Sequence, residues 1–221
     1  MRDAQAEFDA AGIKLFAISY DDQQALKTYA ESENIGYPLL SDVDSEVIRR
    51  YGVINTEVSK QDTVFYGIPF PGVFVTDGTG NVISKFFHDS YKKRDSAEAI
   101  IDAVRGTIQL NEQLPRATTG DEDVTVTAAI HGGRGTIRQG VIRKLVVRFT
   151  LAEGLHIYSH PVPEGMVAAE VRVSGPAGLI IGKSIVPPTR TLRLQSPDVE
   201  LQVWSGVVDF VFEIYGIGEL V

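Results

Sequence analysis

The pattern of apolar residues along this chain of 221 residues changes once, near residue 110. Before that point helical and strand-like segments alternate, which indicates an α/β domain. After residue 123 short alternating or β-branched runs lie between glycine and proline turns, a pattern typical of an antiparallel sandwich. We therefore expect an α/β domain over residues 1–109, a linker over 110–123 and an all-β domain over 124–221.

Local signals predict the elements of the first domain. A charged helix ends near Gly12, and the apolar run that follows it, 13–19, indicates a buried strand. Caps and terminal glycines predict three more helices, over residues 23–33, 44–51 and 97–105. Two runs, 71–77 and 81–87, flank an Asp-Gly-Thr-Gly turn and predict a β-hairpin.

The second domain is expected to contain only strands. The candidate strands are 124–127, 145–151, 169–173, 191–194, 200–204 and 207–214. The glycine-rich segment Gly132–Gly135 offers backbone amides, but it lacks the Lys-Ser/Thr pair and the helix of a phosphate-binding loop. We expect a β-turn there.

Composition excludes several kinds of chemistry. The chain has no cysteine, so it has no disulfide, no thiolate nucleophile and no cysteine metal ligand. Its net charge is -8 and its one basic run is Lys92–Arg94, so no nucleic-acid partner is expected. No apolar run is long enough for a membrane segment, and the first residues lack the pattern of a signal peptide.

Four pieces in order, Gly12–Asp21, Tyr37–Asp42, Tyr51–Val53 and Pro71–Gly80, resemble the peroxiredoxin and thiol-specific antioxidant (AhpC/TSA) family over residues 5–108. The resemblance implies a thioredoxin-like fold. It also implies that Pro71 is the proline that opens the third core strand, usually cis, facing the active-site cysteine, with Pro69 as the competing candidate. We therefore expect a cis Phe70–Pro71 bond, take Phe70 and Pro71 as substrate-binding residues, and assign no catalytic residue.

In that family the chain begins with a strand that leads into the cysteine at the start of a helix, and the resemblance implies that Met1 falls inside this helix. The missing strand is normally central, between the strands predicted at 13–19 and 71–77. Its loss exposes backbone groups that cost about 1–3 kcal/mol each when buried without a partner. We therefore expect the sequence to be a fragment whose first domain lacks its first strand.

The second domain resembles the N-terminal, immunoglobulin-like domain of the transmembrane thiol:disulfide interchange reductases. The segments that carry this resemblance are 154–159, 161–165, 203–206 and 207–212. The redox cysteines of that family lie beyond the point where this chain stops, so we expect an immunoglobulin-like sandwich that is incomplete at its C-terminus. The resemblance favours the bacterial cell envelope, with the cytoplasm as the alternative.

Other candidate sites have simpler explanations. His156 and His160 share a face of an extended segment, but a zinc site needs a third ligand, such as His131 or Glu164, so no metal is expected. Asp22 fits a helix cap better than a magnesium ligand. Neither Ser19 nor Ser159 has the context of a hydrolase nucleophile. Several aromatic residues could line a groove beside Pro71, with Phe70 the main candidate: Phe65, Tyr66, Phe70, Phe74, Phe86 and Phe87.

These features predict a thiol-dependent oxidoreductase of the antioxidant type that reduces a peroxide or a disulfide and is inactive in the form of this cysteine-free chain. Its expected partner is a thiol reductant or a protein disulfide, and no cofactor is implied. The alternative is a cysteine-free binding module with a thioredoxin fold, which docks extended peptides along the strand after Pro71.

Overall fold

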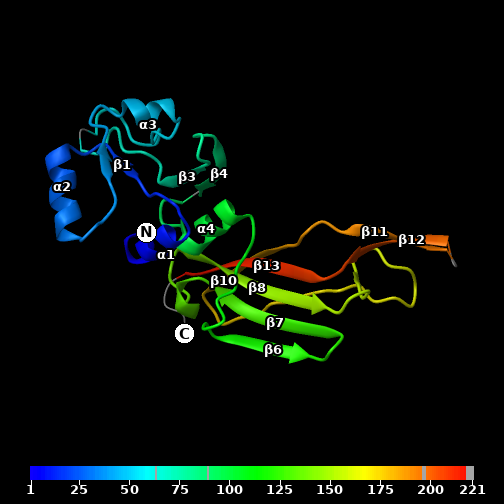
Figure 1. Ribbon diagram of the computed structural model, residues 1–221. Coiled ribbons are helices and arrows are strands. Elements are labelled where there is room, and N and C mark those ends of the chain that lie inside the picture. Colours follow the sequence, from blue (N-terminus) through cyan, green and yellow to red (C-terminus); the bar gives the residue numbers. More distant parts are fainter. Residues whose placement is uncertain (63, 89, 196–197, 218–221) are drawn as a thin grey trace. The chain divides into compact units, whose positions relative to one another are not determined.

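The computed structural model describes residues 1–62, 64–88, 90–195 and 198–217 (Figure 1). The chain divides into two compact units, Met1–Thr107 and Ile108–Val221. The sequence had placed the end of the first domain at residue 109. In the part of the chain that the structure describes, no helix is long and apolar enough to cross a membrane.

The first unit contains the predicted helices. A short 3-10 helix, η1 (Arg2–Ala4), leads into α1 (Gln5–Ala10), and α2 (Gln23–Ser32), α3 (Glu46–Arg50) and α4 (Ala97–Arg105) follow. The Asp22 carboxylate caps α2 by accepting a hydrogen bond from Ala25 N at 2.8 Å. Ser96 caps α4 in the same way, through Ala99 N at 3.2 Å. The helices predicted at 23–33, 44–51 and 97–105 are therefore confirmed, including the cap at Asp22.

The strands of the first unit form two separate pairs. β1 (Ala17–Ser19) pairs in parallel with β2 (Leu39–Ser41), and β3 (Gly72–Thr76) pairs antiparallel with β4 (Val82–Phe87). The hairpin around Asp77 is confirmed. A two-residue strand, β5 (Arg94–Asp95), precedes α4.

The strand predicted over residues 13–19 is shorter than expected. Burial alternates along the whole run, so it is extended throughout, but only Ala17–Ser19 pair with a neighbouring strand. β2 was not predicted, because a strand of three residues with a single apolar pair leaves little periodicity to detect.

The core of the first unit forms around Phe8, which is fully buried. Val75 of β3 and Ile100 and Ile101 of α4 are buried against it, and Ile13 and Leu15 pack at its border. Burying one large apolar side chain of this kind contributes about 1.5–3 kcal/mol. The alternation of the run 13–19 therefore has a clear cause, since Ile13 and Leu15 face this core.

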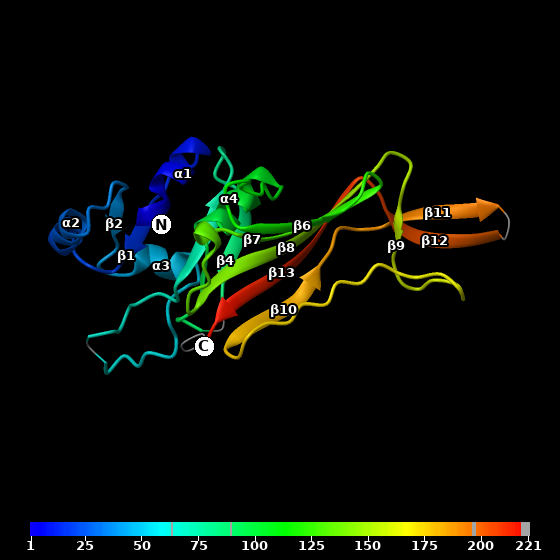
Figure 2. The same ribbon diagram turned by 90° about the horizontal axis from the view of Figure 1, so that it is seen from below.

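The second unit is built from antiparallel strands (Figure 2). The larger sheet has the strand order β10-β13-β8-β7-β6, and the smaller has the order β11-β12-β9. The strands are β6 (Arg116–Gly120), β7 (Val124–His131), β8 (Val141–Leu151), β9 (Ile157–Tyr158), β10 (Leu179–Ile185), β11 (Arg190–Gln195), β12 (Asp198–Trp204) and β13 (Val207–Gly216). The strands predicted at 124–127, 145–151, 191–194, 200–204 and 207–214 are confirmed.

Two predictions for this unit are corrected and a third is confirmed. The expected linker contains β6, which pairs with β7 but is exposed along its whole length, so it carries no apolar pattern. Residues 169–173 pack on the core through alternate side chains but form no strand. Among the described residues, the backbone hydrogen bond that joins them to a neighbouring segment is the one from Ala169 N to Tyr158 O. Gly133–Gly135 form a short 3-10 turn, η2, in which Gly135 N donates to Gly132 O at 3.2 Å, so the β-turn expected there is confirmed, with positive φ at Arg134.

An aromatic cluster lies at the centre of the second unit's core. The Trp204 and Phe210 ring centroids are 5.4 Å apart at 67°, and Phe149 also lies 5.4 Å from Phe210. The Trp204 indole Nε1 donates a hydrogen bond to Pro187 O at 2.8 Å. Such tilted and edge-on contacts are the preferred geometry of aromatic pairs. The immunoglobulin-like kinship of this unit stays a prediction.

Candidate functional site

The segment that enters β3 contains both predicted site residues. Phe70 and Pro71 are half-buried. The Phe70 N–H donates to Val53 O at 2.6 Å, and Asn55 N donates to Ile68 O at 2.9 Å. The loop after α3 and the segment before β3 therefore run side by side, and this pairing fixes the backbone of Phe70 just before the strand.

The cis prediction for the Phe70–Pro71 bond is wrong. Among the described residues the cis peptide bond is His160–Pro161, and the bond before Pro71 is trans. An X–Pro bond prefers trans by about 0.5–1 kcal/mol unless its surroundings reverse that preference. The segment that contains Phe70 is hydrogen-bonded to Val53 O and leads directly into β3.

The aromatic residues near this segment separate onto two faces of the hairpin. Phe74 is the middle of a row: its ring centroid lies 5.2 Å from that of Tyr51 and 5.1 Å from that of Phe87. Lys85 Nζ lies 5.6 Å from the Phe74 ring centroid. Phe86 instead packs against the core around Phe8. Of the aromatic residues expected beside Pro71, Phe74 and Phe87 therefore lie in one row with Tyr51, and Phe86 lies in the core.

Tyr51 was missed as a member of this row because its spacing assigned it to the apolar stripe of α3. A contact between Tyr51 and Phe74 joins residues far apart in sequence, and no local periodicity reveals it. Phe70 makes no ring contact with another aromatic residue in the described part of the chain. Its side chain therefore does not pack in the row of Tyr51, Phe74 and Phe87.

A buried hydrogen bond holds the loop that precedes the site. The Ser45 hydroxyl donates to Gly67 O at 2.9 Å, and Ser45 is only 2% exposed. The Asp42 carboxylate accepts hydrogen bonds from Val47 N and Ile48 N and so satisfies the first turn of α3. The sequence had assigned the start of this helix to residues 44–46, whereas its capping side chain is Asp42.

A hollow that was not predicted from the sequence lies between α2 and the β1–β2 pair. Its volume is about 360 Å³, and its lining includes Ser19, Asp21 and Tyr29. The Ser19 hydroxyl donates to the Asp21 carboxylate, and the Ser41 hydroxyl donates to Asp21 O at 2.7 Å. The hollow is mostly apolar with one polar corner, where β1 and β2 end. It could be found only from the packing of α2 on the strands.

The hairpin turn holds an acidic side chain whose pKa is lowered by its hydrogen bonds. The Asp77 carboxylate accepts hydrogen bonds from the Thr79 hydroxyl at 2.7 Å, from Thr79 N at 2.9 Å and from Asn81 N at 3.0 Å. These donors stabilise the ionised form and lower the pKa of Asp77 to about 2. Its role is to close the turn between β3 and β4.

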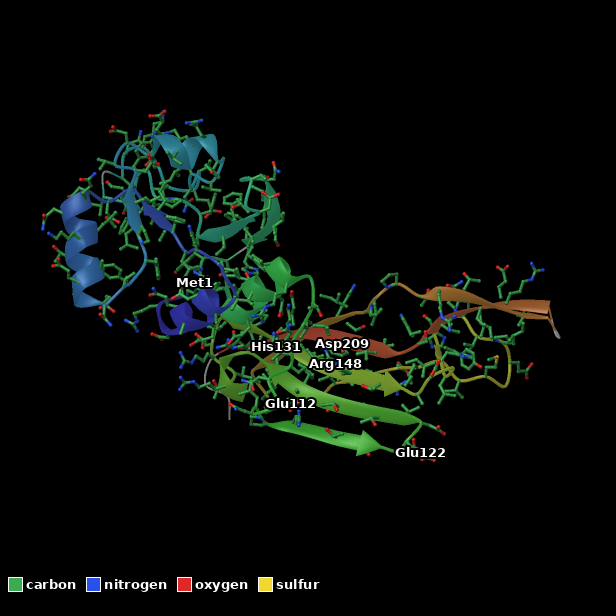
Figure 3. All side chains as sticks on the ribbon, viewed as in Figure 1. Met1, Glu112, Glu122, His131, Arg148 and Asp209 are labelled. Atoms are coloured by element: carbon green, nitrogen blue, oxygen red, sulfur yellow. The ribbon has the colours of Figure 1, made fainter. Side chains whose placement is uncertain are left out.

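The histidines considered for a metal site make other contacts. His156 Nε2 lies 3.3 Å from the Tyr158 hydroxyl, and the two rings meet edge to face. His131 is buried at the end of β7 (Figure 3), and His160 is exposed. Within the described ranges, no three His, Asp or Glu side chains lie close enough together to hold a metal ion.

Comparison with known proteins identifies a class of domain. Residues 1–85 match the model of the AhpC/TSA family. Peroxiredoxin Bcp of Escherichia coli K12 is 27% identical over 106 residues, which are 46% of this chain and 63% of the relative. These matches support a peroxiredoxin-type, thioredoxin-like domain in the first unit.

Two more relatives bear names of the same kind. A protein of Haemophilus influenzae named as a peroxiredoxin, bcp, is 28% identical over 109 residues, 48% of this chain and 65% of the relative. A protein of Mycobacterium tuberculosis named as a peroxiredoxin is 34% identical over 86 residues, 37% of this chain and 51% of the relative. The chain thus spans between half and two thirds of the length of these relatives. No solved structure matches it significantly.

Proposed function

We propose that the first unit is the scaffold of a thiol-dependent reductase of the antioxidant type, which acts on a peroxide or on a disulfide. The family match over residues 1–85 is the observation that carries this proposal. The attacking group in such chemistry is a thiolate, and the chain has no cysteine. In this proposal the chain is inactive until a thiol is supplied to it, and a separate thiol reductant restores that thiol after each turnover.

Phe70 and Pro71 are the substrate-binding residues in this proposal. The Phe70 N–H is engaged by Val53 O, so the segment is held in place while its side chains stay half-buried at the surface. The row of Tyr51, Phe74 and Phe87 continues the apolar surface along β3 and β4. An apolar surface with a fixed backbone suits an organic peroxide or a peptide around a disulfide.

The second unit is proposed to be an immunoglobulin-like domain of the kind found in thiol:disulfide interchange reductases. Its two antiparallel sheets and its core around Trp204 and Phe210 support this part of the proposal. A role in disulfide exchange makes this domain a docking site for a thiol or disulfide partner.

A cysteine-completed chain tests the proposal. The engineered chain carries an additional segment ahead of Met1. This segment consists of a strand followed by the start of a helix that bears a cysteine, as in a peroxiredoxin. We expect it to consume peroxide or reduce insulin disulfides in the presence of dithiothreitol, whereas the same fusion with Cys→Ser does not. Which of the two substrates is turned over faster identifies the substrate class. Equal rates for the two fusions, with both shown to be folded by circular dichroism, would contradict the proposal.

A binding module is the second candidate, and one observation favours it. β3 pairs only with β4 among the described strands, so its other edge can receive an extended peptide just after Pro71. If the cysteine-completed chain is folded but inactive, and the chain protects a bound peptide from hydrogen exchange along β3, this candidate replaces the enzyme.

A further inference from the structure

The turn between β3 and β4 contains the one Asp-Gly pair of the chain, Asp77–Gly78, and the chain has no Asn-Gly pair. In an Asp-Gly pair the backbone nitrogen of the glycine can attack the side-chain carboxyl carbon of the aspartate, because glycine has no side chain to hinder the approach. Asp77, Gly78 and Thr79 are all exposed, so water reaches them. The turn therefore combines a reactive pair of residues with access to solvent.

The reaction open to this pair is rearrangement to isoaspartate, and its only co-reactant is water. A bond forms between Gly78 N and Asp77 Cγ, and a water molecule leaves with a carboxyl oxygen, the carboxyl proton and the proton of Gly78 N. The product is a cyclic succinimide. Water then adds to either ring carbonyl carbon and breaks its bond to Gly78 N. Opening at Cγ restores aspartate, whereas opening at the backbone carbonyl carbon leaves the chain running through Cγ, which is isoaspartate.

In the folded hairpin four hydrogen bonds hold the Asp77 carboxylate. Oδ1 accepts from the Thr79 hydroxyl at 2.7 Å, from Thr79 N at 2.9 Å and from Asn81 N at 3.0 Å. Oδ2 accepts from Asn81 Nδ2 at 3.3 Å, and the same Nδ2 donates to the Thr79 hydroxyl oxygen at 2.8 Å. Donors of this kind stabilise the ionised carboxylate, whereas ring closure starts from the protonated acid.

The two reacting groups differ in how firmly they are held. Asp77 N donates to Asn81 O at 2.9 Å, and Gly80 N donates to Asp77 O at 3.1 Å, so the backbone of Asp77 is fixed as well as its side chain. Among the described residues, no group accepts the N–H of Gly78. The restraint on the reaction therefore lies on Asp77, and ring closure has to release hydrogen bonds there first.

The Thr79 hydroxyl is the main donor in this arrangement. Its hydrogen bond is the largest cause of the lowered pKa of Asp77, which is about 2. The protonated acid is therefore rarer in the folded chain than in an unfolded one at the same pH. Geometry and charge thus act in the same direction, since both oppose attack on Cγ.

We propose that Asp77–Gly78 is the site of isoaspartate formation in this chain, and that the hydrogen bonds from Thr79 and Asn81 slow the reaction in the folded hairpin. Isoaspartate adds a carbon atom to the main chain directly after Thr76, whose pairing with Val82 sets the register at the end of the hairpin. The hydrogen bonds therefore preserve the pairing of β3 with β4. This inference needs no thiol and is independent of the proposed function.

The test compares the folded full chain with a capped peptide of residues 73–82, both incubated at about pH 5, where an ordinary aspartate is mostly ionised. After digestion, chromatography separates the aspartate and isoaspartate forms, and mass spectrometry locates them. We expect isoaspartate at residue 77, formed at least about tenfold more slowly in the folded chain than in the peptide. Equal rates, or isoaspartate at other aspartates and none at residue 77, would overturn the proposal.

Thr79→Val removes the hydroxyl and keeps the backbone N–H and the branched shape of the side chain. We expect the rate at Asp77 to rise at least about threefold in the folded chain and to stay unchanged in the peptide, which lacks the folded turn. Thr79→Ser keeps the hydroxyl and is expected to react like the wild type. An unchanged rate in folded Thr79→Val would overturn the role of Thr79.

Hydrogen exchange of the β3 and β4 amides separates this role from a general loss of structure. We expect exchange in Thr79→Val to match the wild type while isoaspartate forms faster. A rate of isoaspartate formation that rises only in step with faster amide exchange would assign the protection to the hairpin as a whole and overturn the role of Thr79.

Gly78→Ala is the control for the chemistry. A Cβ added at residue 78 meets no atom within 4 Å, so the folded turn has room for it, and the methyl group hinders attack by the backbone nitrogen. We expect Gly78→Ala to remove most of the isoaspartate from both the peptide and the Thr79→Val chain. Undiminished isoaspartate at residue 77 would show that the reaction does not run through the nitrogen of residue 78, and would overturn the proposal.

Discussion

Arg148 on β8 and Asp209 on β13 face each other and form a bidentate salt bridge (Figure 3). Arg148 Nε lies 2.7 Å from Asp209 Oδ1, and Nη2 lies 2.8 Å from Oδ2. Nη2 also donates to Ile108 O at 3.0 Å, so the pair anchors the first residue of the second unit to the centre of its sheet. The carboxylate holds the pKa of Arg148 above its usual value.

Asp209→Asn leaves the half-buried guanidinium without its anion, so we expect it to lower the free energy of unfolding of the second unit by about 1–2 kcal/mol. Chemical denaturation followed by the fluorescence of Trp204, the one tryptophan of the chain, reports on this unit. Glu170→Gln is the matched control, because the Arg172–Glu170 pair is 85% and 57% exposed, and we expect no measurable change in the free energy of unfolding. Equal effects of the two substitutions would show that the Arg148–Asp209 pair is no stronger than a surface contact.

Asp77→Asn tests the turn between β3 and β4. The hydrogen bonds from Thr79 and Asn81 lower the folded-state pKa of Asp77 from 3.8 to about 2. A lowered carboxyl pKa contributes stability that is present above the unfolded value and is lost as pH falls through the folded value. We therefore expect the variant to be less stable at neutral pH and the difference to shrink as pH falls from about 4 to about 2.

Nuclear magnetic resonance titration of the Asp77 carboxyl carbon checks this directly. The expected midpoint is about 2. A midpoint near 3.8 would show that Thr79 and Asn81 do not hold the carboxylate in solution.

Ser45→Ala tests the buried hydrogen bond between Ser45 and Gly67 in the loop that precedes the candidate site. The substitution removes the buried donor to Gly67 O, so we expect the free energy of unfolding of the first unit to fall by about 1–2 kcal/mol. Chemical denaturation monitored by far-ultraviolet circular dichroism measures this change. Gly67→Ala is expected to cost a similar amount, because φ is +101° there and an added Cβ meets Ser45 Oγ at 2.8 Å.

The double variant of Ser45 and Gly67 separates two causes of this cost. Without the Ser45 hydroxyl the added methyl group loses its clash but keeps its strained backbone, so the double loss should be smaller than the sum of the single losses. Strict additivity would mean that the two residues do not contact each other in solution.

Phe70→Ala tests the substrate-binding segment. In the cysteine-completed chain we expect it to raise KM for an organic peroxide or a disulfide peptide, with a smaller effect on kcat, because Phe70 binds substrate and does not react with it. Phe65→Ala is the matched control, since Phe65 lies in the preceding loop and is 52% exposed. A similar rise in KM for both variants would assign no special role to Phe70.

Local signals in the sequence were sufficient for the helices of the first unit and for most strands of the second. Asp22, Ser96 and the terminal glycines act through hydrogen bonds and φ angles within one or two turns, so their effect is readable without tertiary contacts. β6 was missed because none of its side chains is buried. Residues 169–173 were wrongly predicted as a strand because their apolar side chains alternate, although their backbone forms no hydrogen-bonded ladder with a neighbouring strand.

The candidate site was less predictable than the helices. The contact of Tyr51 with Phe74 and the hollow between α2 and β1 both depend on residues distant in sequence. The cis bond expected at Pro71 came from the family resemblance, whereas the bond in this chain is trans.

The rate of dithiothreitol-dependent peroxide and disulfide reduction by the cysteine-completed chain tests the central claim most directly. The account predicts that the added cysteine produces turnover well above the rate of the reductant alone, and that Cys→Ser in the same fusion abolishes it. A folded fusion whose cysteine adds nothing to the rate with either substrate would contradict the claim that residues 1–107 are a scaffold for thiol chemistry.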